Sequence, residues 1–496
     1  DIDRNNQVQL TDLHHHKSDD DDHDDLTSLT NTEHDDIPIE VPHRSACELC
    51  KSLIGAAAGN FLEWFDFAIF GLLADEIGHN FFPQGAKGVQ LLEAFAVYAG
   101  AFLMRPLGGA LFGWIGDKYG RLNALRISIF MMAFPTFLTG CLPTYHDIGI
   151  TSTILLVFLR LIQGLSVGGE ITGALVYVLE ICPPNRRSLF GILVQISGSG
   201  TLLAIIVEAT LRAVFTDQQI YDWAWRLPFL GGIVVAGFGV WIRRALPMSS
   251  EFLHQKDEGK LKENPLLYVL WNNKVIILVL VCHLCVQGSS YYTIYVWLPT
   301  YLHELRENPL ENAYAITVAV MILGMCCSIF SGWLGDKYSP IRVLLTGGCF
   351  YLIGLVILMP LLAYTNEAQT VLVMMGIGVL FGLFGAPSSV WAIDQLEDAS
   401  TRYTALGIGY NISLALFGGT APLFATAVSN KSGIVAWSWI LFTYGVISLS
   451  TEALVTRYKM KQSRHVHKAH LQGVEDKASA KQSPMQDALE HGSADL

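Results

Sequence analysis

The sequence predicts an all-α membrane protein with twelve transmembrane helices arranged as two pseudo-symmetric six-helix bundles. Of its 496 residues 51% are hydrophobic and only 15% are charged, whereas about a quarter of the residues in soluble proteins are charged. Apolar runs of membrane-spanning length recur along the chain. A charged, glycine-punctuated string, Gly113-Trp-Ile-Gly-Asp-Lys-Tyr-Gly-Arg121, returns as Gly332-Trp-Leu-Gly-Asp-Lys-Tyr-Ser339. We call these two strings the loop motifs; their recurrence predicts two halves of one topology.

The apolar runs divide the chain into five parts. We expect twelve spans at residues 53–80, 90–115, 122–142, 152–180, 189–213, 226–246, 275–302, 312–335, 341–363, 370–394, 403–429 and 434–456. The predicted parts are a disordered acidic tail (1–50), a first bundle (51–246), a linker (247–273), a second bundle (274–457) and a disordered tail (458–496).

Charge is distributed unevenly. The formal net charge is −12, but residues 1–50 alone hold fourteen acidic and three basic residues. No acidic surface of the bundles therefore calls for a basic partner, and no nucleic acid is expected. Basic loop residues set the orientation of a membrane protein. One set of loops holds Lys118, Arg121, Arg186, Arg187, Arg243, Arg244, Lys256, Lys260, Lys262, Lys337, Arg342 and Arg402, against Lys87, Arg212, Arg306 and Lys431 on the other side. The first set is predicted to be cytoplasmic, together with both termini.

Two acids stand inside the first predicted span. Glu63 and Asp66 are three residues apart, so they share a helix face, and Glu63 lies roughly 15 Å in from the start of the span. An ionisable group costs several kcal/mol in a bilayer unless it has a partner, a wet cavity or a function. Two neighbouring carboxylates do not both ionise easily, which suits a proton carrier. The alternative is a static pair held by an arginine.

Two arginines stand inside the second and fourth spans. Arg105 and Arg160 keep their protons, so each needs an anion. One interpretation is that an arginine binds a substrate carboxylate through its planar fork, while Asp66, Glu63 and Glu170 are the candidates for proton coupling. The other interpretation is a buried salt-bridge network without a ligand.

An ordered set of strings resembles the major facilitator superfamily, in particular its metabolite:proton symporter branch. The strings are the two loop motifs, Gly59-Asn-Phe-Leu-Glu-Trp-Phe-Asp-Phe67, Arg105-Pro-Leu-Gly-Gly109, Arg160-Leu-Ile-Gln-Gly-Leu-Ser-Val-Gly-Gly-Glu170, Trp225-Arg-Leu-Pro-Phe229, Leu298-Pro-Thr-Tyr-Leu302 and Arg402-Tyr-Thr-Ala-Leu-Gly-Ile-Gly-Tyr-Asn411. The branch includes carriers of proline/betaine, 2-oxoglutarate, citrate and shikimate.

The resemblance implies a cytoplasmic gate and a central cavity. In the gate, Arg402 is expected to pair with Asp117 across the halves. Further gate candidates come from the motifs and the ends of the spans, namely Arg121, Glu180, Arg186 and Asp336. Polar and aromatic residues that are candidates to line the cavity are Gln195, Tyr295, Tyr410 and Asn411.

No nucleotide-binding loop, zinc-ligand spacing or nucleophile elbow is found, so we expect no enzyme activity, metal or cofactor, and an ion gradient as the energy source. The function predicted is proton-coupled symport of a small carboxylate-bearing metabolite, an organic acid or a zwitterionic osmolyte such as proline or betaine, by alternating access. The expected setting is the plasma membrane, with the protein working as a monomer. Two alternatives stay open, a non-transporting receptor of the same fold and a proton-driven exporter.

Overall fold

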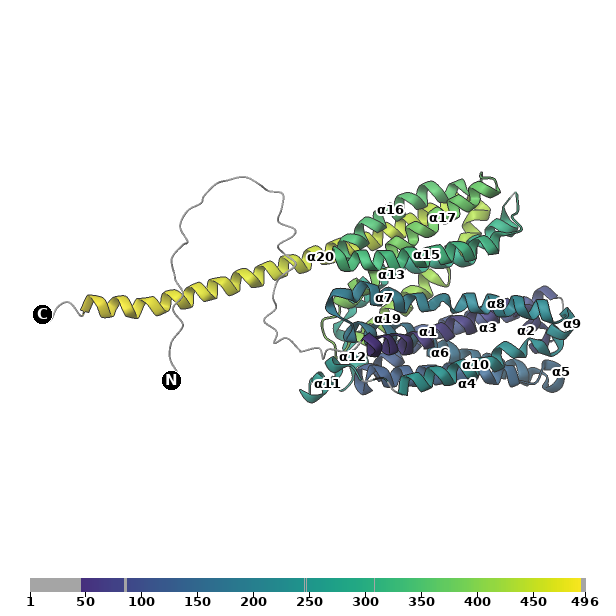
Figure 1. The fold of residues 1–496 in the computed structure, drawn as a ribbon, viewed down its shortest axis with the longest axis horizontal. Coiled ribbons are helices and arrows are strands. Elements are labelled where there is room, and N and C mark those ends of the chain that lie inside the picture. Colours follow the sequence, from purple (N-terminus) through teal and green to yellow (C-terminus); the bar gives the residue numbers. More distant parts are fainter. Residues whose placement is uncertain (1–45, 84–86, 245, 247, 307, 492–496) are drawn as a thin grey trace. The chain divides into compact units, whose positions relative to one another are not determined.

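The computed structural model describes residues 46–83, 87–244, 246, 248–306 and 308–491, and no strand occurs among them (Figure 1). The predicted acidic tail lies outside this part of the chain, except for residues 46–50, which form the start of the first helix. The protein is therefore described from that helix onward.

The first half is built from ten helices of very different length. They are α1 (Ala46–Leu72), α2 (Ala74–Phe81), α3 (Lys87–Tyr119), α4 (Arg121–Cys141), α5 (Tyr145–Ile148), α6 (Ile150–Ile181), α7 (Arg187–Ile196), α8 (Gly200–Val214), α9 (Asp217–Gln219) and α10 (Arg226–Arg244). A 3₁₀ segment, Ser197–Ser199, joins α7 and α8 into one crossing. The first predicted span, 53–80, is divided because α1 ends at Leu72 and α2 begins at Ala74.

The linker and the second half contain the other ten helices. They are α11 (Ser250–Asp257), α12 (Pro265–Asn272), α13 (Lys274–Tyr292), α14 (Leu298–Thr300), α15 (Ala313–Lys337), α16 (Pro340–Leu361), α17 (Glu367–Gly385), α18 (Ser388–Asp394), α19 (Arg402–Ser413) and α20 (Ala421–His491). Gly433, at φ 76°, interrupts α20 and separates the eleventh crossing from the twelfth. The helix then continues to His491, where the sequence predicts a disordered tail from residue 458.

The helices account for twelve crossings. Within the described residues nine stretches are long and apolar enough to cross a bilayer, and the last of them, Arg402–Arg464, contains the interruption at Gly433 and so crosses twice. The remaining two crossings are α3, which is 33 residues long, and α10, which is 19 residues long. The predicted all-α fold in two bundles is confirmed.

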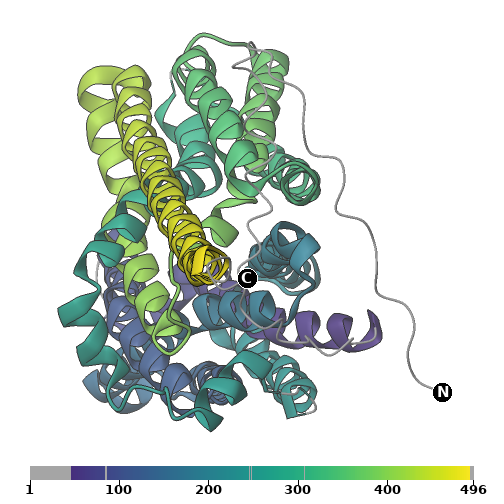
Figure 2. The ribbon, with the colours of Figure 1, turned by 90° about the vertical axis from the view of Figure 1, so that its left-hand side faces the viewer.

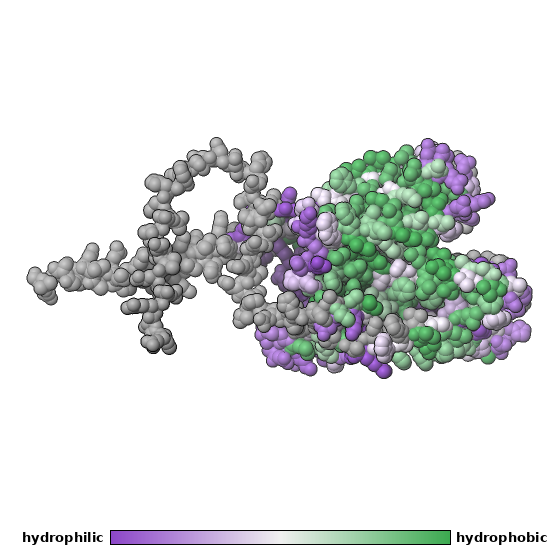
Figure 3. All heavy atoms as spheres, in the orientation of Figure 1, coloured by the Kyte–Doolittle hydropathy of each residue, from purple (hydrophilic) through white to green (hydrophobic). Residues whose placement is uncertain are grey.

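The surface has the pattern of a membrane protein. Hydrophobic residues cover the middle of the visible face, and hydrophilic residues gather at both ends of the helices (Figure 3). Large apolar side chains are exposed on the described helices, among them Leu103, Val234, Trp241, Val275 and Leu372. A soluble protein rarely exposes so much contiguous apolar surface, whereas acyl chains cover it in a bilayer.

Each half has its own core, and a further cluster joins them. In the second half Trp297, Tyr351 and Trp437 are buried together, and in the first half Phe81 and Trp225 are. The joining cluster includes residues of α3, α6, α18 and α19. It lies at the end of the helices that carries the loop motifs, which we call the motif end. Figure 2 shows the helices from a view turned by 90°, with the early helices in purple to teal and the later ones in green to yellow.

Candidate functional site

The first loop motif binds the beginning of a helix in the other half. The buried carboxylate of Asp117 accepts the backbone N–H groups of Tyr403 at 3.2 Å and Thr404 at 2.8 Å, in the first turn of α19. The first N–H groups of a helix lack partners within the helix, and the helix dipole is positive there. Asp117 therefore acts as a capping anion supplied from across the two halves.

The second loop motif repeats this contact with the halves exchanged. Asp336 accepts the backbone N–H groups of Ser188 at 2.7 Å and Leu189 at 3.0 Å, at the beginning of α7. The first motif thus caps the eleventh crossing, and the second caps the fifth, its counterpart in the other half. The repeat in the sequence is matched by a repeat of one physical interaction.

Glycines allow the helices of the two halves to touch. A Cβ on Gly109 would lie 2.3 Å from the carbonyl oxygen of Gly407, and one on Gly113 would lie 2.5 Å from the Cα of Thr404. In the second motif, a Cβ on Gly335 would lie 2.9 Å from Ser188 Oγ. These close approaches are made between the halves, by α3 on α19 and by α15 on α7.

Ion pairs surround these contacts, and one predicted pair is wrong. Arg402 contacts Glu180 at 3.4 Å and Glu251 at 3.0 Å, and not Asp117 as the family resemblance implied. Asp117 instead lies 3.3 Å from Arg121, which also contacts Glu180 at 3.2 Å. Backbone N–H groups fill the remaining places around Asp117, so no room is left for the Arg402 guanidinium.

A second pair between the halves lies at the surface of the motif end. Arg187 Nη1 lies 2.7 Å from Asp394 Oδ1. The sequence predicts Arg186 for this gate, but the neighbouring Arg187 makes the pair. Both partners are partly exposed, so this bridge contributes at most about 1 kcal/mol.

Asp66 and Arg160 form a buried network in the first half, in which Arg160 Nε and Nη2 have no hydrogen-bond partner. Asp66 Oδ2 lies 2.7 Å from Arg160 Nη1, and Thr136 Oγ1 donates to Asp66 Oδ1 at 2.9 Å. Gln163 Nε2 lies 3.2 Å from both carboxylate oxygens. The Arg160 guanidinium lies 3.8 Å from the centre of the Phe70 ring. All of these groups are buried, so Asp66 already has a full set of partners.

Glu63 and Arg105 form a looser contact one helical turn away. Glu63 Oε1 lies 3.4 Å from Arg105 Nη1, and the buried Glu63 Oε2 has no hydrogen-bond partner. Arg105 Nε reaches Asn411 Oδ1 of α19 at 3.4 Å. Asn411 in turn donates to the carbonyl oxygen of Gly168 at 2.6 Å. Arg105 thus links the two halves and holds Glu63 only weakly.

Glu170 is paired with an arginine that the sequence analysis placed in a loop. Arg243 is fully buried, and its guanidinium donates to both carboxylate oxygens of Glu170. Its Nε also donates to the carbonyl oxygen of Gly55 in α1 at 2.7 Å. A Cβ on Gly59 would overlap with Glu170 Oε1, so this glycine makes room for the pair. Glu170 thus holds α6, α10 and α1 together.

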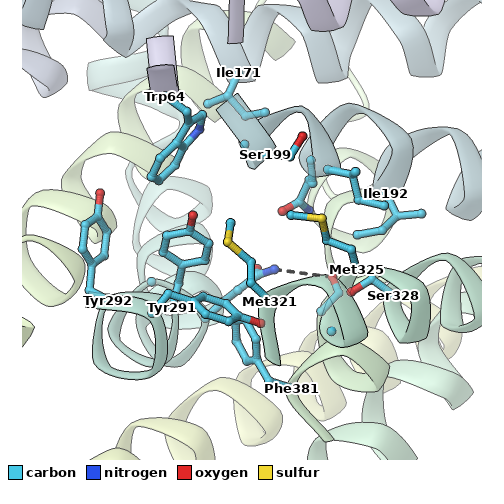
Figure 4. A pocket seen from close by; sticks show the side chains of 18 of the residues that line it. Trp64, Ile171, Ile192, Ser199, Tyr291, Tyr292, Met321, Met325, Ser328 and Phe381 are labelled. Carbon is cyan, nitrogen blue, oxygen red and sulfur yellow. Dashed lines mark hydrogen bonds between the residues drawn. The ribbon is translucent and has the colours of Figure 1, made fainter. Parts of the chain in front are cut away.

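A cavity of about 140 Å³ lies between the halves and is lined mainly by aromatic and apolar side chains. Trp64 approaches it from the first half, and Tyr291, Met321 and Phe381 approach it from the second (Figure 4). The rings contact one another, with centroids 5.1 Å apart for Trp64 and Tyr291. The polar lining residues are Asn60, Gln195, Ser199, Gln287 and Ser328. The volume is smaller than the roughly 300–1,000 Å³ of sites for drug-sized ligands, which favours a small ligand.

The cavity contains some of the predicted residues and not others. Gln195, Tyr295 and Tyr410 line it. The charged candidates and Asn411 do not, and the described cavity wall contains no acidic or basic side chain. Arg105 and Glu63 contact each other outside the cavity lining, and Arg105 reaches Asn411, the neighbour of the lining residue Tyr410. Sequence reasoning did not single out Met321, Met325 and Phe381, because apolar residues in a membrane helix carry no signal of facing a cavity.

Comparisons with known proteins agree with this architecture. A sequence model of the Major Facilitator Superfamily matches residues 56–418. A putative proline/betaine transporter of Staphylococcus aureus (strain MSSA476) is 34% identical over 391 residues, covering 77% of this chain and 83% of the relative. The alpha-ketoglutarate permease of Escherichia coli (strain K12) is 30% identical over 410 residues, covering 82% and 93%. A structure of the proton:xylose symporter XylE bound to 6-bromo-6-deoxy-D-glucose matches with a TM-score of 0.67 at 15% identity, covering 84% and 96%. The structural match shows the fold.

Proposed function

This chain belongs to the Major Facilitator Superfamily, and on that premise we propose that it is a proton-coupled symporter of a small zwitterionic metabolite of the proline/betaine class. It is a multi-pass membrane protein and not an enzyme. Transport follows alternating access, in which the two halves expose the cavity to one side of the membrane and then to the other.

The observation that carries the substrate class is the neutral, aromatic wall of the cavity. Quaternary ammonium groups bind to the faces of Trp and Tyr rings through cation–π attraction. Trp64, Tyr291, Tyr295 and Tyr410 offer such rings. A dicarboxylate would need cations in the wall, and the described lining residues include none. This favours proline or betaine, the substrates named for one group of relatives, over 2-oxoglutarate.

The coupling proton is assigned to Glu63. Asp66 and Glu170 are each held by an arginine and by further donors, which stabilises their charged forms. Glu63 has one long contact and one buried oxygen without a partner, so protonation of its carboxylate breaks few stabilising interactions. Arg105, the cation that contacts Glu63, is then free to attract the substrate carboxylate.

We assign the motif end to the cytoplasm, with both termini there and the protein in the plasma membrane. The basic loop residues support this orientation. The contacts of Asp117 and Asp336 close the motif end, while Figure 3 shows a hollow between the halves at the opposite end. The described state would then be outward-facing. Substrate, protons and lipid are the expected partners, and one copy of the chain forms the whole pathway.

The test is uptake into proteoliposomes with an imposed pH gradient, alkaline inside. Radiolabelled glycine betaine, proline and 2-oxoglutarate are compared for wild type, Glu63→Gln and the matched control Glu208→Gln, which changes an acid of α8 that is paired with Arg212. Wild type and control are expected to accumulate betaine or proline until a protonophore is added. Glu63→Gln is expected to exchange substrate without accumulating it. Accumulation that survives the protonophore, or a preference for 2-oxoglutarate, contradicts the proposal.

The cavity is tested separately by binding. Replacing Tyr291 by Leu removes one ring face, and cation–π contributions of about 1–2 kcal/mol correspond to a roughly 5- to 30-fold loss of betaine affinity. Tyr314→Leu, at an exposed tyrosine of α15, is the control and should bind as wild type does. Equal binding by both variants would contradict the aromatic site.

A further inference from the structure

The second half contains a buried acid–base pair that the proposed function does not use. His283 of α13 and Glu452 of α20 are both buried, and His283 Nδ1 lies 2.8 Å from Glu452 Oε1. The other carboxylate oxygen, Oε2, is buried without a hydrogen-bond partner. Ser448 Oγ donates to Oε1 at 3.0 Å. A buried charge that is incompletely paired is costly, so the protonation state of this pair affects the energy of the second half.

The partners of the histidine determine where its protons are. Ser388 Oγ donates to Gln287 Oε1 at 2.9 Å, and Gln287 Nε2 donates to the carbonyl oxygen of Gly385 at 3.4 Å. The single hydroxyl proton of Ser388 is therefore already used. His283 Nε2 lies 2.9 Å from Ser388 Oγ and 3.2 Å from the Ser388 carbonyl oxygen, which can only accept. A proton on Nε2 is the arrangement that satisfies these contacts together with the Ser388–Gln287 hydrogen bond.

It follows that a second proton lies between His283 and Glu452. With Nε2 protonated, a bare Nδ1 facing an ionised carboxylate would bring two lone pairs together at 2.8 Å. One proton, on Nδ1 or on Oε1, removes this repulsion. The pair in the described state then has no net charge, either as imidazolium and carboxylate or as imidazole and carboxylic acid.

Loss of one proton would rearrange the chain of hydrogen bonds as far as the cavity. The deprotonated pair keeps its proton on Nδ1, facing the carboxylate, and Nε2 becomes an acceptor. The Ser388 hydroxyl must then turn from Gln287 to His283, which leaves Gln287 Oε1 without its donor. Gln287 lines the cavity. Proton release and the polar wall of the cavity are thus linked through one hydroxyl group.

The other titratable groups near His283 and Glu452 are bound elsewhere or face away from the pair. On α13 and α20, Cys285 Sγ donates to the carbonyl oxygen of Tyr444 at 3.4 Å. On α18, Asp394 is paired with Arg187, and Lys459 of α20 contacts Glu397. On α19, Arg402 is paired with Glu180 and Glu251 and Tyr410 faces the cavity. Trp391, with its ring centroid 4.4 Å from that of His283, covers the imidazole.

From this geometry we propose that His283 and Glu452 form a second proton-binding site, in the half opposite to Glu63, and that Ser388 and Gln287 link its occupancy to the cavity. The site binds and releases a single proton; the hydrogen bonds of Ser388 rearrange, and no other covalent bond changes. This inference rests on the proposed symport for its role in transport, but the proton site itself does not depend on it.

The first test is spectroscopic and needs no substrate. The full-length protein is labelled with ¹⁵N-histidine and reconstituted, and the His283 signals are assigned by their absence in His283→Gln or their shift in Glu452→Gln. Nε2 is expected to be protonated at low pH and to lose its proton as the pH rises. His303→Gln, at an exposed histidine of the same half, should leave these signals unchanged. An Nε2 that keeps one protonation state from pH 5 to 10 overturns the proposal.

The second test measures the link to the cavity. Adding glycine betaine to the wild type is expected to shift the midpoint of the His283 titration by about one pH unit, a tenfold change in proton affinity. In Ser388→Ala, which keeps the pair but removes the connecting hydroxyl, betaine should leave the midpoint unchanged. An equal shift in both proteins overturns the link.

The two proposals fail separately. If His283 titrates but wild-type uptake ignores the pH gradient, the proton site stands and the proposed symport is wrong. If uptake is driven by the pH gradient but His283 does not titrate, symport stands and the second site is wrong.

Discussion

Glu63 and Asp66 occupy one face of one helix, yet their surroundings differ sharply. Asp66 accepts from Arg160, Thr136 and Gln163, whereas Glu63 has a single 3.4 Å contact with Arg105. The sequence gives no means of distinguishing them, because the donors come from three other helices. From the sequence both are candidates for the coupling proton, and the contacts in the structure favour Glu63.

The first prediction separates a structural acid from a functional one. Asp66→Asn removes the anion of a buried pair and leaves Arg160 uncompensated, which typically costs about 3–5 kcal/mol. Glu63→Gln removes an acid with a weak partner and is expected to cost about 1 kcal/mol or less. Thermal unfolding in one detergent, at one pH, compares the two variants. Equal loss of stability would mean that Glu63 is also a structural anchor.

The second prediction concerns Glu76 in α2, outside the membrane-spanning helices. Burial raises the pKa of its carboxyl group above the ordinary value, although Arg212 lies 3.2 Å away. A raised pKa means that the folded state binds the proton more tightly than the unfolded state does, so the stabilisation is present at low pH and is lost as the pH rises through the folded pKa.

Glu76→Gln should remove this pH dependence, because glutamine does not titrate. Its melting temperature is expected to equal that of wild type near pH 4 and to exceed it slightly near pH 8. Glu208→Gln, which changes another acid paired with the same Arg212, is the control. A variant that is less stable than wild type at pH 8 would show that the pair with Arg212 outweighs the cost of burial.

Helix ends explain why the gate was only partly predictable. The loop motifs were recognised, but their carboxylates bind backbone N–H groups, which every residue except proline carries and which no pattern in the sequence marks. Arg243 was assigned to a loop because it stands beside Arg244 at the end of a span, yet it is buried against Glu170. A sequence shows which residues are charged, but not which of two neighbours points inward.

The third prediction tests helix contact across the halves. A Cβ on Gly109 would lie 2.3 Å from the backbone of Gly407, so Gly109→Ala forces α3 and α19 apart. Gly100→Ala, in the same helix, would meet only a side-chain carbon at 4.0 Å and is the matched control. Uptake of glycine betaine should fall at least tenfold in the first variant and stay near wild type in the second. Unchanged uptake in Gly109→Ala would show that this contact is not needed.

At the scale of the whole molecule, composition and the repeated motif were sufficient to predict the fold. A bilayer requires apolar helices of similar length, and each membrane-spanning segment of the sequence meets this requirement. The cavity was less accessible to sequence reasoning, because a membrane helix is apolar both toward lipid and toward a ligand. The repeat also implies that one aspartate of each half caps a helix of the other half, so that the two halves close on each other symmetrically.

The last prediction concerns this closure. The position of a Cβ on Gly335 lies 3.1 Å from the Cβ of Ser188, close to the spacing of about 3.5–4.5 Å in disulfides. Ser188→Cys combined with Gly335→Cys, in a background without the native cysteines, should form a bond that ties α7 to α15 under mild oxidation. The halves can then no longer separate at the motif end.

Uptake should therefore stop on oxidation and return with a reductant, while binding of glycine betaine from the opposite end persists. The single variant Gly335→Cys is the control for the substitution itself. If the disulfide forms completely and uptake continues, the contacts made by Asp117 and Asp336 do not open during transport, and alternating access through this end is wrong. If binding is lost as well, the cavity is reached through the motif end, and the assignment of the described state as outward-facing must be reversed.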